Sequence, residues 1–293
     1  MGTYRAPVED MNFIIDELLD VEGTLGALPA YADLGVGADL TTALLDEGAK
    51  LAGDVLAPLR RVGDEQPASC RDGKVTASPG FEDGLRQMAA GGWIGIAAAP
   101  EHGGQGLPEL YITATHEMWN AANMAFALAP LLYSSAALAI AAHGSDQQKQ
   151  TYLEKMHSGE WFGTMNLTEA GAGSDLGVMK SKAVPEGDHY RIYGQKIFIT
   201  WGDHQAGEDI VHLVLAKLPD APEGSRGISL FIVPKFLVNE DGSPGERNDV
   251  YPVSCEHKLG IHGSPTCVMA FGDKDGAVGY LLGQENQGLA CMF

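Results

Sequence analysis

The chain has 293 residues, of which 45% are apolar, so it is long enough for one to three domains with well-filled cores. It carries 19 Lys and Arg against 39 Asp and Glu, a formal net charge of −20 at pH 7. So acidic a surface argues against nucleic acid and anionic membranes as partners, because both would repel it.

Four cysteines, Cys70, Cys255, Cys267 and Cys291, lie far apart in the sequence and form no C-x-x-C pair. This pattern favours buried small hydrophobes over disulfides or metal ligands. It is typical of a reducing compartment. The first ten residues lack the apolar stretch of a secretory signal. We therefore expect a cytoplasmic protein without a metal site.

The first half of the chain is predicted to be helical. Apolar residues over 11–19 follow the i, i+3, i+4, i+7 spacing of an amphipathic helix. Residues 23–37, punctuated by Gly and Pro, look like a linker or a clasp. Cap and breaker residues then place further helices, at 39–61, 79–90, 109–126, 131–143 and 146–158. Short loops join these helices, which predicts an all-α domain.

One helical stretch imitates a membrane span. Residues 121–142 carry no charge over a length that could cross a bilayer. They are mostly alanine, however, and include Asn123, Pro130 and Tyr133. This composition favours a buried helical hairpin broken at Pro130 over a membrane span.

From Trp161 onward the pattern changes to short β-branched or aromatic runs separated by turn residues. These runs predict strands at 161–167, 190–193, 196–200, 210–218, 228–234 and 266–271. No helical period lies between them, so we expect an antiparallel sandwich or barrel and not a parallel βαβ sheet. The predicted fold is α+β, with an extension at 1–37, an all-α domain at 38–160, a β domain at 161–275 and the start of a truncated C-terminal helical domain at 276–293.

Two segments carry the candidate chemistry: residues 166–175, Asn-Leu-Thr-Glu-Ala-Gly-Ala-Gly-Ser-Asp, and residues 193–200, Tyr-Gly-Gln-Lys-Ile-Phe-Ile-Thr. The first offers hydroxyls and close backbone approach, suited to a pyrophosphate or a thioester-bearing ligand. The second ends with Phe198 and Thr200, expected on one face of a strand. Donors, a hydroxyl and an aromatic wall are what a flavin ring requires. On spacing alone, a β-turn followed by an ordinary hairpin strand explains the residues equally well.

Taken together, the motifs resemble the acyl-CoA dehydrogenase family. Leu-Thr-Glu-x-x-Ala-Gly-Ser-Asp is followed at this distance by Gly-Gln-Lys-x-Phe-Ile-Thr, and later by Lys-Leu-Gly-Ile-His-Gly-Ser-Pro-Thr at 258–266. The helical-then-β order matches too, and the resemblance covers essentially the whole chain. The early helix and an insertion at 239–250 look like the larger subgroup that includes 3-methylthiopropionyl-CoA dehydrogenases. The sequence departs from the family pattern at Asn166 and Val178.

The resemblance implies a cofactor, FAD, and a role for each matching residue. Met165, Leu167 and Thr168 would meet the pyrimidine edge of the flavin. Gly173 and Ser174 would lie by the FAD pyrophosphate, and Ser174 also by the acyl-CoA. Phe198 would cover the dimethylbenzene side, and Thr200 would reach N5. The complete set of implied cofactor-binding residues is Met165, Leu167, Thr168, Gly173, Ser174, Phe198, Ile199 and Thr200.

The implied activity is FAD-dependent oxidation of a saturated acyl-CoA to the trans-2-enoyl-CoA, with hydride transfer to flavin N5. Electrons would pass to an electron-transfer flavoprotein, and family members are dimers or tetramers. The catalytic base would be a glutamate from the C-terminal helical region, expected after Phe293. Two alternatives stay open: a flavin- or acyl-CoA-binding module without the base, and an acyl-CoA oxidase or flavin monooxygenase on the same scaffold.

Three further polar residues are considered for roles in the site. Glu169 and Asp175 look like a carboxylate pair, but in this loop they are expected to brace backbone amides. His262 replaces an Arg common in relatives, and it is interpreted as a solvated loop histidine rather than a ligand contact.

Overall fold

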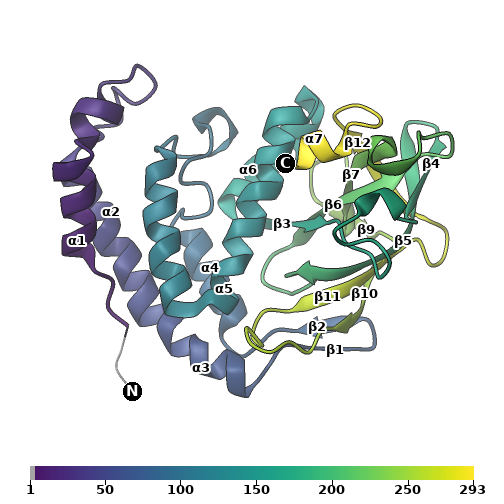
Figure 1. Cartoon of the computed structure of the whole chain (residues 1–293), viewed down its shortest axis with the longest axis horizontal. Coiled ribbons are helices and arrows are strands. Elements are labelled where there is room, and N and C mark those ends of the chain that lie inside the picture. Colours follow the sequence, from purple (N-terminus) through teal and green to yellow (C-terminus); the bar gives the residue numbers. More distant parts are fainter. Residues whose placement is uncertain (1–3) are drawn as a thin grey trace.

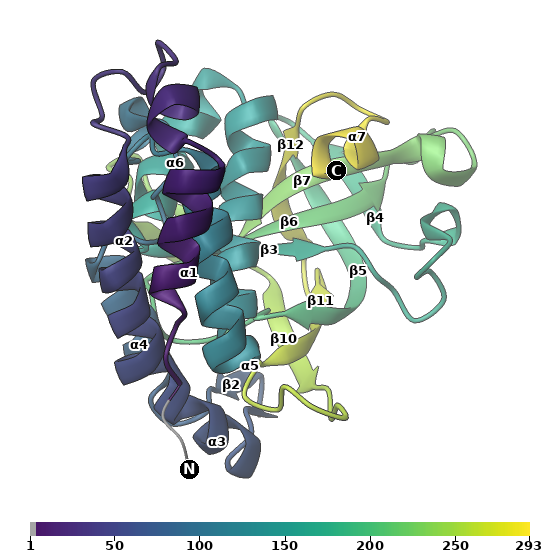
Figure 2. The same cartoon turned by 60° about the vertical axis from the view of Figure 1, so that its left-hand side comes forward.

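The computed structural model describes residues 4–293. A helical part and a β-sheet part lie side by side, with the N-terminal helices at the end remote from the sheet (Figure 1). The turned view shows α1 and α2 on the outer side of the helical part (Figure 2). The predicted order of a helical domain followed by a β domain is therefore confirmed.

Within the described residues the helical part contains six α-helices. They are α1 (Val8–Asn12), α2 (Ala38–Lys50), α3 (Ala57–Glu65), α4 (Phe81–Ala90), α5 (Glu109–His143) and α6 (Asp146–Ser158). π-Helical turns follow α1 and separate α2 from α3, and longer connections at 66–80 and 91–108 flank α4. A small hairpin, β1 (Ser69–Arg71) with β2 (Lys74–Thr76), interrupts the region predicted to be all-α. Its strands are too short to give a periodic signal, and the Cys70 thiol lies 3.7 Å from the Pro252 carbonyl oxygen of the main sheet.

Helix α5 forms the predicted hairpin, but the turn is at Asn123 and not at Pro130. Asn123 has φ −160° and ψ 89°, outside the helical region. Its side-chain oxygen accepts from the Phe126 N–H at 3.2 Å, and its amide donates to the Leu56 carbonyl oxygen at 3.1 Å. The second arm therefore starts with an Asn cap. Pro130 lies within this arm.

By length and composition α5 could cross a membrane, and half of its most apolar window is buried inside the protein. The two arms of α5 run side by side in both views (Figures 1 and 2). Residues of both arms also line one cavity of about 430 Å³. This arrangement is that of a core hairpin.

The β part is an eight-stranded sheet in the order β10-β11-β5-β12-β7-β6-β3, with β4 pairing with β5 and β6. The strands are β3 (Trp161–Asn166), β4 (Lys182–Glu186), β5 (His189–Thr200), β6 (Asp209–Lys217), β7 (Ile228–Pro234), β10 (Val250–Cys255), β11 (Thr266–Phe271) and β12 (Ala277–Leu282). A separate hairpin joins β8 (Phe236–Val238) to β9 (Pro244–Arg247). The pairing is antiparallel as predicted, except that β6 runs parallel to β3 and β4.

The sheet extends further along the chain than the sequence pattern indicated. Residues 277–282, expected to open a C-terminal helical domain, form β12 between β5 and β7. The sequence pattern does not indicate this strand because a glycine, Gly279, interrupts the apolar run; in the structure Gly279 packs closely against Ile192. The helix expected in this segment is present as α7 (Gly288–Met292).

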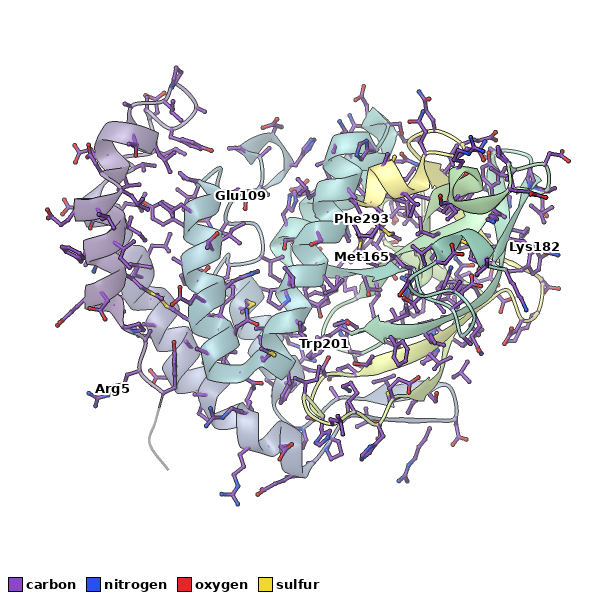
Figure 3. The ribbon with its side chains drawn as sticks, in the orientation of Figure 1. Arg5, Glu109, Met165, Lys182, Trp201 and Phe293 are labelled. Atoms are coloured by element: carbon purple, nitrogen blue, oxygen red, sulfur yellow. The ribbon has the colours of Figure 1, made fainter. Side chains whose placement is uncertain are left out.

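Trp201 joins the two parts of the molecule. It follows β5 directly and is fully buried. Its indole N–H donates to the Ala125 carbonyl oxygen of α5 at 3.2 Å, and its ring lies 6.2 Å from Phe81 and 6.3 Å from Phe126. The end of β5, where the second candidate segment lies, is thereby fixed against the helical part. Figure 3 shows Met165, Trp201 and Phe293 at this junction.

The cap at Asn123 gives a test of the helical hairpin. Asn123→Ala is expected to lower the free energy of unfolding by about 2 kcal/mol, because it removes two buried hydrogen bonds worth about 1 kcal/mol each. Asn120→Ala is the matched control, since among residues 4–293 the Asn120 side chain bonds only to His116, one turn back in the same helix. Urea unfolding of both variants gives the comparison. Equal losses would contradict the assigned cap.

Candidate functional site

The two candidate segments are in direct contact. The loop that follows β3 lies against β5, because the Ile197 N–H donates to the Thr168 carbonyl oxygen at 2.8 Å. The Lys196 ammonium donates to the Leu167 carbonyl oxygen at 3.0 Å. The Thr164 hydroxyl, on β3, donates to the Thr200 carbonyl oxygen at 2.9 Å. Both ends of the 196–200 stretch are therefore fastened to β3 or to its loop.

A buried ion pair holds the loop. Lys196 is fully buried, and its Nζ lies 2.9 Å from Glu169 Oε1. The same carboxylate accepts the amides of Lys180 at 2.6 Å and Ser181 at 3.0 Å. Burial alone would raise the pKa of Glu169, but these amides and the Lys196 charge outweigh it and hold the pKa below its usual value. Burial lowers the pKa of Lys196, and the nearby Glu169 opposes that effect.

The carboxylates of the loop brace it, as predicted, and do not form a catalytic pair. Glu169 caps the amides at the far end of the loop, and its backbone forms two hydrogen bonds with Ala172, at 2.9 and 3.0 Å. Asp175 Oδ1 accepts the Gly177 N–H at 2.8 Å. A loop tied at both carboxylates presents its remaining groups in fixed positions.

The outer side of the loop borders open space. A cavity of about 470 Å³ is lined by residues including Leu167, Thr168, Gly173 and Ser174. A side chain added at Gly171 would meet nothing, and one added at Gly173 would meet only the Thr168 methyl group at 3.9 Å. Packing within this chain therefore does not require glycine at either position. The space left open is where another molecule could approach the backbone closely.

Phe198 stands exposed in a costly backbone conformation. Its side chain is 57% exposed, and its φ is 59°. Lys196 pairs with Met269 and Ile199 with Cys267, so two residues of β5, including Phe198, face one residue of β11 in a bulge. A left-handed conformation costs a bulky residue about 1–2 kcal/mol and is typical of functional sites. An exposed aromatic ring held this way can serve as a wall for a planar ligand.

The remaining residues that the resemblance implies as cofactor-binding fall into two groups. Some have side chains free to bind a ligand, and others have side chains partly buried against the core. Within residues 4–293 the hydroxyls of Thr168, Ser174 and Thr200 form no hydrogen bond with another residue. Ile199 is buried. Met165 and Leu167 pack partly against the core of the β part, which leaves their backbone and outer edges to meet a ligand.

The sequence analysis did not predict the buried ion pair between Lys196 and Glu169, and its interpretation of His262 was wrong. Lys196 lies in the second motif, and the sequence pattern assigns it no role; its only signal is a lysine directly before the apolar run 197–199 of a strand. His262 is not a solvated histidine: its ring nitrogens lie 2.9 Å from Asp64 Oδ1 and 2.7 Å from the Lys258 carbonyl oxygen. It ties the loop between β10 and β11 to α3.

The ion pair gives a stability prediction. Lys196→Met is expected to lower the free energy of unfolding by about 3 kcal/mol, because it leaves the buried Glu169 carboxylate without its countercharge. The same change at the exposed Lys182 of β4 is the control, with an expected effect within about 0.5 kcal/mol. Chemical denaturation measures both. A loss at Lys196 no larger than that at Lys182 would contradict the assigned brace.

The lowered pKa of Glu169 predicts a pH dependence. Its carboxylate stabilises the fold above the unfolded-state pKa of about 4.3, and this contribution disappears as the pH falls through the lower folded-state pKa. Glu169→Gln should therefore be less stable than the wild type at neutral pH, with the difference shrinking below about pH 4. Unfolding curves across this range test it, with the exposed Glu246→Gln as control. A difference independent of pH would refute the assignment.

Comparison with known proteins identifies the family. Residues 49–160 match the acyl-CoA dehydrogenase N-terminal domain, and residues 164–273 match the acyl-CoA dehydrogenase middle domain. The chain is 46% identical over 292 residues to a 3-methylmercaptopropionyl-CoA dehydrogenase of Ruegeria pomeroyi, covering 99% of this chain and 49% of the relative. It is 38% identical over 301 residues to a butyryl-CoA dehydrogenase of Syntrophomonas wolfei, covering 100% and 49%.

A solved structure shares the fold. It is an acyl-CoA dehydrogenase of Bacillus anthracis, complexed with FAD, with a TM-score of 0.69 and 24% identity over 85% of this chain and 39% of the other. The present chain spans about half the length of the curated relatives it matches. With its helical and β parts in the family's order and the family's motifs meeting at their junction, the chain belongs to the acyl-CoA dehydrogenase family.

Proposed function

We propose that this protein takes part in FAD-dependent oxidation of a saturated acyl-CoA thioester to the trans-2-enoyl-CoA. The observation that carries the proposal is the contact between the two motifs. An exposed aromatic, Phe198, and three hydroxyls that bond to no other residue in the described part of the chain are presented around a loop that a buried ion pair holds in place. FAD is the cofactor of acyl-CoA dehydrogenases, and when bound it accepts the hydride from the substrate β-carbon at N5.

The residues present fit that cofactor. We assign the backbone and hydroxyl of Thr168, with Met165 and Leu167, to the pyrimidine edge, where donors stabilise the negative charge of reduction. Phe198 and Ile199 would provide the apolar wall and Thr200 the hydroxyl near N5. The open backbone at Gly173 and the Ser174 hydroxyl would meet the pyrophosphate and the acyl-CoA, since both need close approach.

The remaining chemistry is a proton transfer. The α-proton of the thioester must be removed by a base. We propose that this base is a glutamate. It would lie in a segment equivalent to the part of the relatives that the present chain does not match. The electrons would pass to an electron-transfer flavoprotein, and a homo-oligomer would form, as in the family. The relatives named for 3-methylmercaptopropionyl-CoA and butyryl-CoA make short acyl thioesters the first substrates to test.

The visible spectrum of the purified protein tests the activity. With FAD bound and the proposed glutamate present, anaerobic addition of butyryl-CoA or 3-methylmercaptopropionyl-CoA should bleach the flavin and yield the enoyl-CoA. Bound flavin that does not bleach would limit the protein to a flavin- and acyl-CoA-binding role. Oxygen consumption without an electron-transfer flavoprotein would indicate an oxidase. Protein that neither contains nor takes up FAD would contradict the proposal.

Phe198 gives a sharper test of the flavin wall. Phe198→Ala should weaken FAD binding by about tenfold, because it removes an aromatic contact worth about 1.5 kcal/mol. Tyr193→Ala, the loss of another exposed aromatic on β5, is the control and should leave the affinity unchanged. Titration of FAD fluorescence measures both affinities. Equal affinities of the two variants would remove Phe198 from the site.

A further inference from the structure

The sheet brings two cysteines of the chain directly opposite each other. Cys255 ends β10, Cys267 lies in β11, and the two are register partners in the antiparallel pair. Both are free thiols. The loop of residues 256–266 separates them in sequence, so their spacing matches no C-x-x-C motif. Their contact comes from strand pairing alone.

The backbone geometry at this pair suits a disulfide. The Glu256 N–H donates to the Thr266 carbonyl oxygen at 2.8 Å, just beyond the pair. This bond makes Cys255 and Cys267 a non-hydrogen-bonded pair of the ladder, in which the Cα atoms approach to about 4.5 Å. That separation lies inside the range of about 4.4–6.8 Å found across disulfides. Side chains of directly opposed residues also lie on the same face of the sheet.

The two thiols differ in the way that a reactive and a resolving cysteine differ. Cys255 is half-buried, whereas Cys267 is fully buried. A hydrogen bond with the Cys267 side chain, together with the Lys258 charge, lowers the pKa of Cys255. The same hydrogen bond and burial raise the pKa of Cys267. A partly exposed cysteine with a lowered pKa, next to a second, buried cysteine, is the arrangement of peroxide-sensitive cysteines.

We propose that Cys255 and Cys267 form a reversible disulfide when the protein meets a hydroperoxide. The Cys255 thiolate attacks the O–O bond of hydrogen peroxide, giving a sulfenic acid and a hydroxide ion, which takes up a proton to become water. The Cys267 sulfur then attacks the Cys255 sulfur. The S–S bond forms, the S–O bond breaks, and the hydroxide leaves as water with the Cys267 proton. Two thiols lose two electrons, and the peroxide is reduced to water. Two equivalents of a small thiol then reduce the Cys255–Cys267 disulfide by exchange and are themselves oxidised to a disulfide.

The disulfide would lie next to the proposed flavin wall. Cys267 pairs with Ile199 on its other side, and Thr266 pairs with Thr200. The new bond would also close the neck of the loop 256–266, whose His262 contacts Asp64 of α3. Oxidation would therefore join β10 covalently to the strand that supports Ile199 and Thr200.

Cys70 is the competing partner. Its thiol lies on β1, beside β10, and burial together with the neighbouring Cys255 raises its pKa. It belongs to another element, however, and has no register partner in the main sheet. The register therefore favours Cys267 as the partner of Cys255.

Peptide mass mapping of the whole chain tests the assignment, because trypsin places each cysteine in a different peptide. Cys255 falls in 248–258, Cys267 in 259–274, Cys70 in 62–71 and Cys291 in 275–293. The reduced protein is treated with hydrogen peroxide, blocked with iodoacetamide in denaturant and digested without reductant. We expect 248–258 joined to 259–274, with a mass two hydrogens below the sum of the two peptides. Treatment with a thiol reductant before blocking should abolish the link.

Variants separate this pairing from its rivals. Cys267→Ser should abolish the link and let dimedone trap the Cys255 sulfenic acid, whereas Cys291→Ser should leave the link intact. Cys267→Ala serves the same purpose should the serine variant not fold. A link between 62–71 and 248–258 in the wild type would overturn the assignment. The assignment would also be overturned if iodoacetamide alkylated both Cys255 and Cys267 after treatment with enough peroxide to oxidise methionines, because both thiols would then have stayed free. The readout is a mass, so it does not depend on flavin binding or catalysis.

Discussion

The candidate site depends on one buried charge. Lys196 places an ammonium where no water reaches it, and it bonds to the Glu169 carboxylate and the Leu167 carbonyl oxygen. A buried charge is tolerated only when it is paired and hydrogen-bonded. The loop after β3 is therefore obliged to remain where it satisfies Lys196. Its outer groups, the Thr168 and Ser174 hydroxyls among them, keep fixed positions as a result.

A second constraint fixes the end of β5, the strand against which that loop lies. The last residues of β5 lead into Trp201, which packs against Phe81 and Phe126 and bonds to α5. The exposed ring of Phe198 lies three residues earlier, in a bulge against β11. Because β5 is fixed both by this contact and by its neighbouring strands, the strain at Phe198 is held by the surrounding structure and does not relax.

Strand β11 links the proposed flavin wall to the cysteine pair. One edge of the strand pairs with Ile199 and Thr200, and the other places Cys267 against Cys255. A disulfide between Cys255 and Cys267 on one edge of β11 would restrict the strand that pairs with the proposed flavin wall on its other edge. Chemistry at the cysteines and ligand binding at β5 are thus adjacent in space, although their residues lie more than fifty positions apart in the sequence.

The sequence by itself determined the order of helical and β parts, most element positions and the two motifs, because periodicity, caps and turn residues act locally. It did not determine that the helical hairpin turns at Asn123, since the Asn123 side chain is also held by a bond to Leu56, far away in the sequence. It also missed β12, which is recognisable only through its neighbours β5 and β7. The role of Lys196, the bulge at Phe198 and the Cys255–Cys267 pair were decided by the tertiary structure alone, because each arises from contacts between strands or loops that local sequence does not encode.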